Sequence, residues 1–302
     1  MLKVILGVLL GAIVVVMPMQ GGEVNYLYDR NGVRYELYQT NAGRPFNWLL
    51  FPGGAGVDSS YLRSLVDVLN LPGNVWLIDF PGNGDNISAN FSGNFDEWFS
   101  IFPQIIRRFD NPVIVGHSFG GMFPLLFPEL EKMVRGCAIL NSAPKMWHQE
   151  AVVYAKQFDL PDFNVEIQAF MQHPNQQTFQ AALGACMPYY FPKKTLESGK
   201  QWLLSIPFPY LPALWWQETV MESNFSATWI PQSVPTLIIG GKYDCMCPFS
   251  LFQKDARFQR PNIELCFIED AGHISWRDNP AAVRGAFDRL IALLDAKDTL
   301  HE

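Results

Sequence analysis

The chain has 302 residues and a formal net charge of −7, from 29 acidic and 22 basic side chains. Hydrophobic residues make up 49% of the chain and charged residues only 17%, against roughly 25% charged in an average soluble domain. The acidic balance and the lack of a basic cluster argue against nucleic-acid binding, which depends on Lys and Arg contacts to phosphates. The 23 Phe, 10 Tyr and 9 Trp argue against a disordered chain, because they supply large apolar surfaces for a core.

The first predicted element is an uncharged N-terminal run, residues 4–19, which follows a single basic residue, Lys3. A basic start, a short apolar run and then small residues are typical of a secretory signal. The run is shorter than the ~20 residues of a spanning helix, but no clear A-x-A cleavage site follows it. We predict that residues 1–22 are a signal peptide or an uncleaved membrane anchor, and that the protein is exported (periplasmic or secreted) or anchored. A misassigned start or a buried helix is the alternative.

Eight β-prone runs follow this segment. The first two, residues 24–29 and 33–39, flank an Asn31-Gly32 turn and predict a hairpin. The later runs are continuously apolar, which is typical of strands covered on both faces of a parallel sheet. They span residues 46–51, 75–80, 112–116, 137–141, 235–240 and 263–268, and helical patterns separate them at 60–70, 96–109, 119–132 and 280–294. The order of elements predicts an α/β fold with an antiparallel start.

One interval between predicted strands is unusually long. Residues 145–231 contain 16 aromatic residues and several prolines that divide the interval into short helices. We interpret this interval as a helical cap inserted into a core formed by residues 23–144 and 232–302. An aromatic-rich cap suits a substrate pocket, with Trp147 and Trp215 as candidate substrate-binding residues. A purely structural insertion is the alternative.

The most specific motif is Gly116-His117-Ser118-Phe119-Gly120, which lies between a predicted strand and a predicted helix. This is the G-x-S-x-G pattern in the strand–turn–helix context of a nucleophile elbow. Glycines on both sides leave room for the tight turn that exposes the serine hydroxyl. We therefore expect Ser118 to be the catalytic nucleophile, which then requires an adjacent base.

Among the five histidines, His273 is the best candidate base, because it follows the last predicted strand on a Gly-containing loop. The other four lie in the elbow, in the predicted cap or at the C-terminus: His117, His148, His173 and His301. An acid must fix the tautomer of the base. Asp244, just after the strand at 235–240, fits the order Ser…Asp…His of this type of hydrolase. Asp270, three residues before His273, is the less favoured alternative.

The developing oxyanion needs preorganised N–H donors. The Phe119 amide, at the start of the predicted nucleophile helix, is one candidate donor. The Gly-rich loop after residue 51 is expected to supply the second, from Gly54 or, as the next choice, Gly53. No G-K-[ST] sequence follows this loop, which argues against phosphate binding. A triad with an oxyanion hole needs neither cofactor nor metal, and none is expected.

These motifs resemble the α/β-hydrolase family over nearly all of residues 24–298. The matching pieces are residues 52–56, 79–84, 116–121, 241–244 with Pro248, and 272–273. The resemblance implies an α/β-hydrolase fold: a mostly parallel eight-stranded sheet with helices on both faces and an inserted helical cap. The G-G-x-G loop and the run from Met221 to Leu237 are similar to the proline iminopeptidase branch. Three positions depart from that branch, with Pro52 in place of His, Ala55 in place of Pro and Phe119 in place of Trp.

The leading functional prediction is a serine hydrolase that cleaves a carboxylic ester with an apolar acyl or alcohol group, through an acyl-enzyme. The alternative is an aminopeptidase like the proline iminopeptidases, in which Glu218 and Glu222 hold the free amine of a short peptide. These two residues are spaced i, i+4, and a solvated helix face would explain them equally well. A non-catalytic relative used for binding is the third hypothesis.

Overall fold

The computed structural model describes residues 26–42, 44–87, 91–221 and 225–299. The predicted export segment and Glu222 therefore lie outside the described residues. Within the described ranges, no helix is long and apolar enough to cross a membrane. Secretion, anchoring and the cleavage of residues 1–22 remain predictions.

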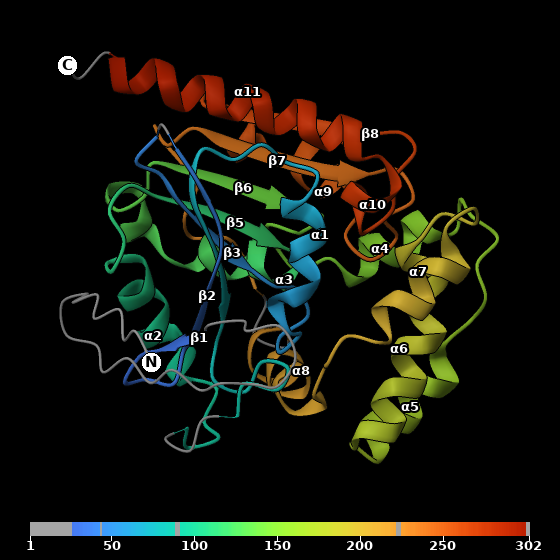
Figure 1. The fold of residues 1–302 in the computed structure, drawn as a ribbon. Coiled ribbons are helices and arrows are strands. Elements are labelled where there is room, and N and C mark those ends of the chain that lie inside the picture. The colour runs from blue at the N-terminus through green and yellow to red at the C-terminus, as the bar shows by residue number, and fades with distance from the viewer. Residues whose placement is uncertain (1–25, 43, 88–90, 222–224, 300–302) are drawn as a thin grey trace.

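The described residues form one eight-stranded sheet with the strand order β1-β2-β4-β3-β5-β6-β7-β8 (Figure 1). Strands β1 and β2 form the predicted antiparallel hairpin, and β2 is also antiparallel to β4. All other neighbours are parallel. The strands are β1 (Tyr26–Tyr28), β2 (Arg34–Asn41), β3 (Asn47–Phe51), β4 (Gly73–Asp79), β5 (Pro112–His117), β6 (Gly136–Leu140), β7 (Thr236–Gly241) and β8 (Ile263–Ile268). The predicted α/β class and the antiparallel start are confirmed.

Helices cover both faces of this sheet, so the central strands are buried on both sides. One core cluster packs α1 (Arg63–Val66), α10 (Ser275–Asp278) and α11 (Pro280–Thr299) against the sheet. A second cluster does the same with α2 (Glu97–Ile106), α3 (Phe119–Met122) and α9 (Ser250–Gln253). Figure 1 shows α11 along one side of the sheet and α2 on the other.

Two predicted helices are shorter than their patterns suggested. The run predicted over residues 119–132 is divided into α3 and two 3₁₀ helices, Phe123–Leu126 and Pro128–Lys132. Pro124 and Pro128 explain the division, since proline has no N–H to donate and its ring disfavours a continuous α-helix. The helix predicted over 60–70 is a 3₁₀ turn, Ser59–Leu62, followed by α1.

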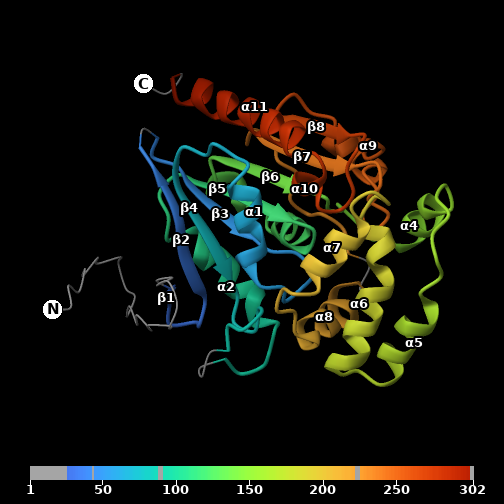
Figure 2. The same cartoon turned by 45° about the vertical axis from the view of Figure 1, so that its right-hand side comes forward.

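The described residues between β6 and β7 form five α-helices, which we call the α4–α8 segment: α4 (His148–Ala155), α5 (Asn164–Gln172), α6 (Gln176–Tyr190), α7 (Leu196–Leu203) and α8 (Tyr210–Trp216). A π-helical turn, Gln217–Met221, follows α8. Figure 2 shows the segment grouped beyond the ends to which β6 and β7 point. Phe170, Phe179 and Ala182 give it a small core of its own. Its position places it over the edge of the sheet where Ser118 lies.

Candidate active site

Ser118 occupies a strained turn between β5 and α3. Its φ and ψ are 52° and −119°, a conformation that non-glycine residues rarely adopt. The turn is tight enough that a Cβ on Gly116 would lie 2.0 Å from the carbonyl oxygen of Gly120. The Ser118 amide donates to the carbonyl of Leu140, at the end of β6. A strained backbone conformation, held by a hydrogen bond to the neighbouring strand, is expected for a nucleophile elbow.

His273 and Asp244 lie next to each other, although 29 positions separate them in sequence. Nδ1 of His273 is 2.9 Å from Oδ2 of Asp244, and both side chains are buried. Oδ1 of Asp244 accepts from the amides of Met246 and Cys247 at 3.0 and 2.8 Å. Because a carboxylate only accepts, it keeps a proton on Nδ1 of His273 and leaves Nε2 able to accept one.

Asn141 is a further residue of this cluster, and sequence reasoning missed its role. It follows β6 with a φ of 48°. Its Nδ2 donates to Oδ2 of Asp244 at 3.1 Å and to the carbonyl of Gly272 at 2.9 Å. Its Oδ1 accepts from the hydroxyl of Ser275 at 2.8 Å. One buried amide thus joins the loop of the acid to the loop of the histidine.

The two candidate amides of the Gly-rich loop after β3 differ in their hydrogen bonding. The Gly53 N–H donates to the hydroxyl of Tyr61 at 2.7 Å, so it is already hydrogen-bonded. Within the described chain, the amides of Gly54 and Phe119 donate to no other group. This geometry favours Gly54 over Gly53 as the second oxyanion donor.

The same loop touches the α4–α8 segment directly. Gly54 has a φ of 30°, and a Cβ there would lie 2.4 Å from Cζ of Phe208. A Cβ on Gly56 would lie 2.3 Å from Cγ of Pro212. The two glycines therefore permit the segment to lie directly on the loop.

Ser118 and His273 both line one cavity. The other lining residues are mainly apolar or glycine: Gly53, Gly54, Val57, Tyr61, His117, Leu183, Tyr190, Leu203, Phe208 and Ile274. The cavity has a volume of about 330 Å³, part of which is open to solvent. A serine and a histidine at such an apolar cavity are suited to a ligand with an apolar group.

Of the four candidate residues for substrate binding, the three that the structure describes do not line this cavity. Trp147 is buried and packs against His148. Trp215 packs on Trp98, and its Nε1 donates to Asp96 at 2.8 Å. Glu218 is exposed on the π-helical turn, and Glu222 is outside the described residues. The aromatic count indicated an apolar pocket but could not say which side chains face it.

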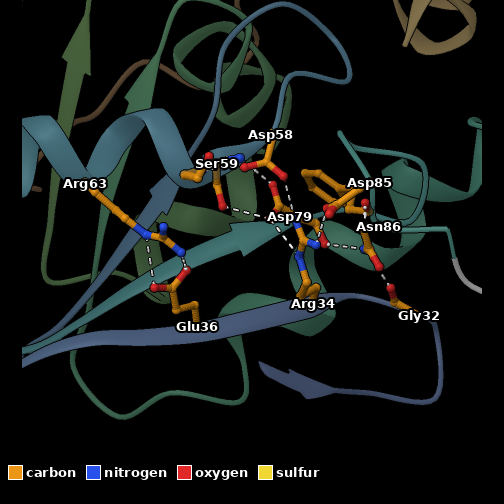
Figure 3. A network of polar contacts seen from close by, with 11 residues as sticks. Gly32, Arg34, Glu36, Asp58, Ser59, Arg63, Asp79, Asp85 and Asn86 are labelled. Atoms are coloured by element: carbon orange, nitrogen blue, oxygen red, sulfur yellow. Dashed lines mark hydrogen bonds and ion pairs between the residues drawn. The ribbon is translucent and has the colours of Figure 1, made fainter. Parts of the chain in front are cut away.

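A charged cluster, which we call the Arg34 cluster, holds the other end of the Gly-rich loop (Figure 3). The Arg34 side chain is 4% exposed and donates to Asp79 at 2.7 Å, to Asp58 at 2.7 Å and to Asp85. Asp79 also accepts from the amide and the hydroxyl of Ser59 at 2.7 and 2.8 Å. Three carboxylates therefore share one guanidinium.

This crowding has an electrostatic consequence. Burial raises the pKa of the Asp79 carboxyl to about 6; Arg34 opposes the rise and the nearby Asp58 carboxylate adds to it. The amide of Asp58 donates to the carbonyl of Pro207, between α7 and α8. The cluster therefore connects β2 and β4 to both the Gly-rich loop and the α4–α8 segment.

Comparisons with known proteins agree with this architecture. MenH from S. aureus is 16% identical, with a TM-score of 0.61, and the match covers 86% of this chain and 98% of that one. A proline iminopeptidase-related protein from Thermus thermophilus is 17% identical, with a TM-score of 0.63 and coverages of 89% and 97%. An esterase from Exiguobacterium antarcticum is 16% identical, with a TM-score of 0.61 and coverages of 89% and 98%. At these identities the likeness shows the fold alone. No curated protein matches the sequence.

The family model described as the alpha/beta hydrolase family matches residues 48–286, which is well over half of the chain. The matched range includes Ser118, Asp244 and His273, as well as the Gly-rich loop after β3. The resemblance inferred from the motifs is confirmed, and this chain belongs to the alpha/beta hydrolase family.

Proposed function

We propose that this protein is a serine hydrolase that cleaves a carboxylic ester with an apolar acyl or alcohol group. The observation that carries the proposal is the placement of Ser118, on a strained turn, at the same cavity as a histidine held by Asp244. The geometry does not require a cofactor, since this set of groups suffices for acyl transfer.

In the proposed reaction, Oγ of Ser118 attacks the ester carbonyl while Nε2 of His273 takes the hydroxyl proton. The carbonyl electron pair moves onto oxygen, where the amides of Gly54 and Phe119 stabilise it. The tetrahedral intermediate then collapses, and the leaving alcohol takes the proton from His273. A water molecule, deprotonated by the same imidazole, hydrolyses the acyl-enzyme and restores Ser118.

The apolar cavity supports an ester with an apolar group over a peptide with a free amine. An N-terminal ammonium requires a carboxylate partner in the site, and no Asp or Glu is among the described residues that line this cavity. Glu218 is exposed instead. Aminopeptidase activity is therefore the second candidate, and it would depend on Glu222.

The α4–α8 segment acts in this proposal as a cap over the site. Leu183 from α6, Leu203 from α7 and Phe208 between α7 and α8 supply the apolar wall of the cavity. We further propose that residues 1–22 direct export or anchor the protein. Cell fractionation of the full chain and of a variant lacking residues 1–22 tests this second point, because a cytoplasmic full-length protein would contradict it.

A fluorophosphonate probe tests the hydrolase proposal directly. Wild-type protein should be labelled covalently and Ser118→Ala should not, while Ser198→Ala on the exposed face of α7 serves as the matched control and is labelled like wild type. A folded wild-type protein without labelling would favour the non-catalytic hypothesis.

A substrate panel separates ester from amide cleavage. Aryl esters of increasing acyl length are compared with prolyl and alanyl arylamides. The proposal expects ester turnover, and a Leu203→Ala variant should shift preference toward longer acyl groups by about tenfold in relative kcat/KM. Faster turnover of the arylamides, lost on Glu222→Gln, would replace the esterase proposal with the aminopeptidase.

A further inference from the structure

A chain of buried hydrogen bonds runs beside the proposed catalytic residues and takes no part in the mechanism above. Nε2 of His117 is 2.9 Å from the carbonyl oxygen of His273, and Nδ1 of His117 is 2.6 Å from the hydroxyl of Tyr61. The Tyr61 hydroxyl in turn accepts from the Gly53 amide at 2.7 Å. Tyr61 and His117 are both buried.

The chemistry of the end groups fixes the direction of every bond. A carbonyl oxygen only accepts, so Nε2 of His117 carries the proton that it donates to His273. An amide N–H only donates, so the Tyr61 oxygen accepts from Gly53 and its own proton goes to Nδ1 of His117. With a neutral imidazole, each donor has one acceptor and the direction is uniform from Gly53 to His273.

Burial favours that neutral form. It lowers the pKa of His117 well below its usual range, and the neighbouring His273 lowers it further. Burial also raises the pKa of Tyr61. The side chains of this hydrogen-bond chain are therefore uncharged at neutral pH. The His117 ring lies 4.8 Å from the His273 ring, centroid to centroid.

The hydrogen-bond chain through Tyr61 and His117 contacts three separate parts of the site. Gly53 directly precedes Gly54, the favoured second oxyanion donor; His117 directly precedes Ser118; and the third contact is the main chain of His273 itself. These parts lie on the loop after β3, at the end of β5 and on the loop after β8, and no local sequence pattern joins them.

We propose that Tyr61 and His117 are positioning residues, which fix the relative positions of the oxyanion loop, the nucleophile and the histidine loop through this chain of hydrogen bonds. The proposal rests on the proposed hydrolase function. Neither side chain exchanges a proton with the substrate. A neutral His117 also avoids placing a second positive charge next to His273 when its imidazolium forms during the reaction.

The test measures ester hydrolysis by Tyr61→Phe and His117→Ala in the full chain. Misplacement of these three parts of the site should lower kcat by about 10- to 100-fold and leave KM within about twofold of the wild-type value, because it affects the transition state more than substrate binding. The inhibition constant of a boronic acid, which mimics the tetrahedral intermediate, should rise in parallel with the loss in kcat/KM. His117→Gln, whose amide N–H can reach the His273 carbonyl, should recover part of the rate.

Tyr35→Phe is the matched control. Its buried hydroxyl donates to Asp29 at 2.9 Å, away from the cavity, so the same atom is removed and kcat should stay at the wild-type value. Wild-type kcat in both Tyr61→Phe and His117→Ala, or losses no larger than in the control, would overturn the proposal.

A measurement on the wild-type protein covers variants that do not fold. The ¹⁵N resonances of the His117 ring should show a neutral imidazole with the proton on Nε2. An imidazolium, or a proton on Nδ1, at pH 7 overturns the proposed chain. Failure of the hydrolase function is distinguishable, because it appears as a wild-type protein that the fluorophosphonate probe does not label.

Discussion

The two ends of the Gly-rich loop are held by two buried networks of opposite kind. At Asp58 the Arg34 cluster uses charge, with three carboxylates around one guanidinium. At Gly53 the chain through Tyr61 and His117 uses neutral groups whose hydrogen bonds have one direction. Buried charges carry a large desolvation cost that only their partners offset, whereas neutral hydrogen bonds contribute modestly to stability but fix geometry. We therefore expect the first network to govern the stability of the loop and the second to govern its alignment.

Removal of the cation should give the largest effect on stability. Arg34→Met leaves Asp58 and Asp79 buried without their shared partner, so the free energy of unfolding should fall by about 3–5 kcal/mol. Urea denaturation measures the change. Arg289→Met is the matched control, because its ion pair with Glu264 has an arginine side chain that is 55% exposed, and such pairs contribute about 0–1 kcal/mol. Equal losses in the two variants would remove the distinction between the networks.

The pH dependence of stability should reveal Asp79 next. Its pKa is raised to about 6 in the folded protein, so between about pH 4 and 6 the folded state holds a proton that the unfolded state has released. The stabilisation from this group is present at low pH and lost as pH rises through about 6, by about 3 kcal/mol in total. Asp79→Asn should remove this decline. Parallel stability curves for the two proteins from pH 4 to 7 would contradict the assignment.

His117 should contribute a slope of the opposite sign. Its pKa is lowered in the folded protein, so on acidification the unfolded state binds a proton that the folded state does not. Stability from this group is present above about pH 6.5 and lost as pH falls, by at most about 1.4 kcal/mol per pH unit for one proton. His117→Gln should flatten that acid limb in denaturation curves, with the contribution of Asp79 unchanged. A steeper acid limb in the variant would show that the histidine is charged.

The neutral chain should show the smallest cost in stability. Tyr61→Phe removes one hydroxyl and leaves the Gly53 amide without its partner, which should cost about 1–2 kcal/mol. Thermal and urea unfolding of Tyr61→Phe, compared with the same measurements on Tyr35→Phe, give this loss in stability. A loss as large as that of Arg34→Met would mean that the Tyr61–His117 chain holds the loop as firmly as the ion cluster does.

Much of the fold followed from local signals in the sequence. The hairpin turn at Asn31-Gly32, the continuous apolar runs and the elbow around Ser118 each have a short-range physical cause, and the strand pairing agrees with all three. The pairing of His273 with Asp244 was also predictable, because both follow strands whose carboxyl ends meet at one edge of the sheet.

The rest depended on contacts between distant segments. Tyr61 lies 56 positions from His117, and Asn141 lies 103 positions from Asp244, so no periodicity or spacing marks either partnership. The α4–α8 segment shows the same limit, because its aromatic content does not reveal that Leu203 and Phe208 face the cavity while Trp147 and Trp215 do not. The prolines at 124 and 128 are visible in the sequence, but the apolar periodicity around them favours a longer helix than these prolines allow.

The close contact of Gly54 with Phe208 and of Gly56 with Pro212 has a kinetic consequence. Phe208 also lines the cavity that contains Ser118, so in the proposed reaction we expect substrate entry or product release to displace the chain around Phe208 and Pro212 through the surrounding solvent. Solvent friction slows such a displacement, while it leaves a proton transfer between fixed side chains unaffected. Turnover should therefore fall as sucrose raises the viscosity of the medium, most clearly for esters whose chemical step is fast.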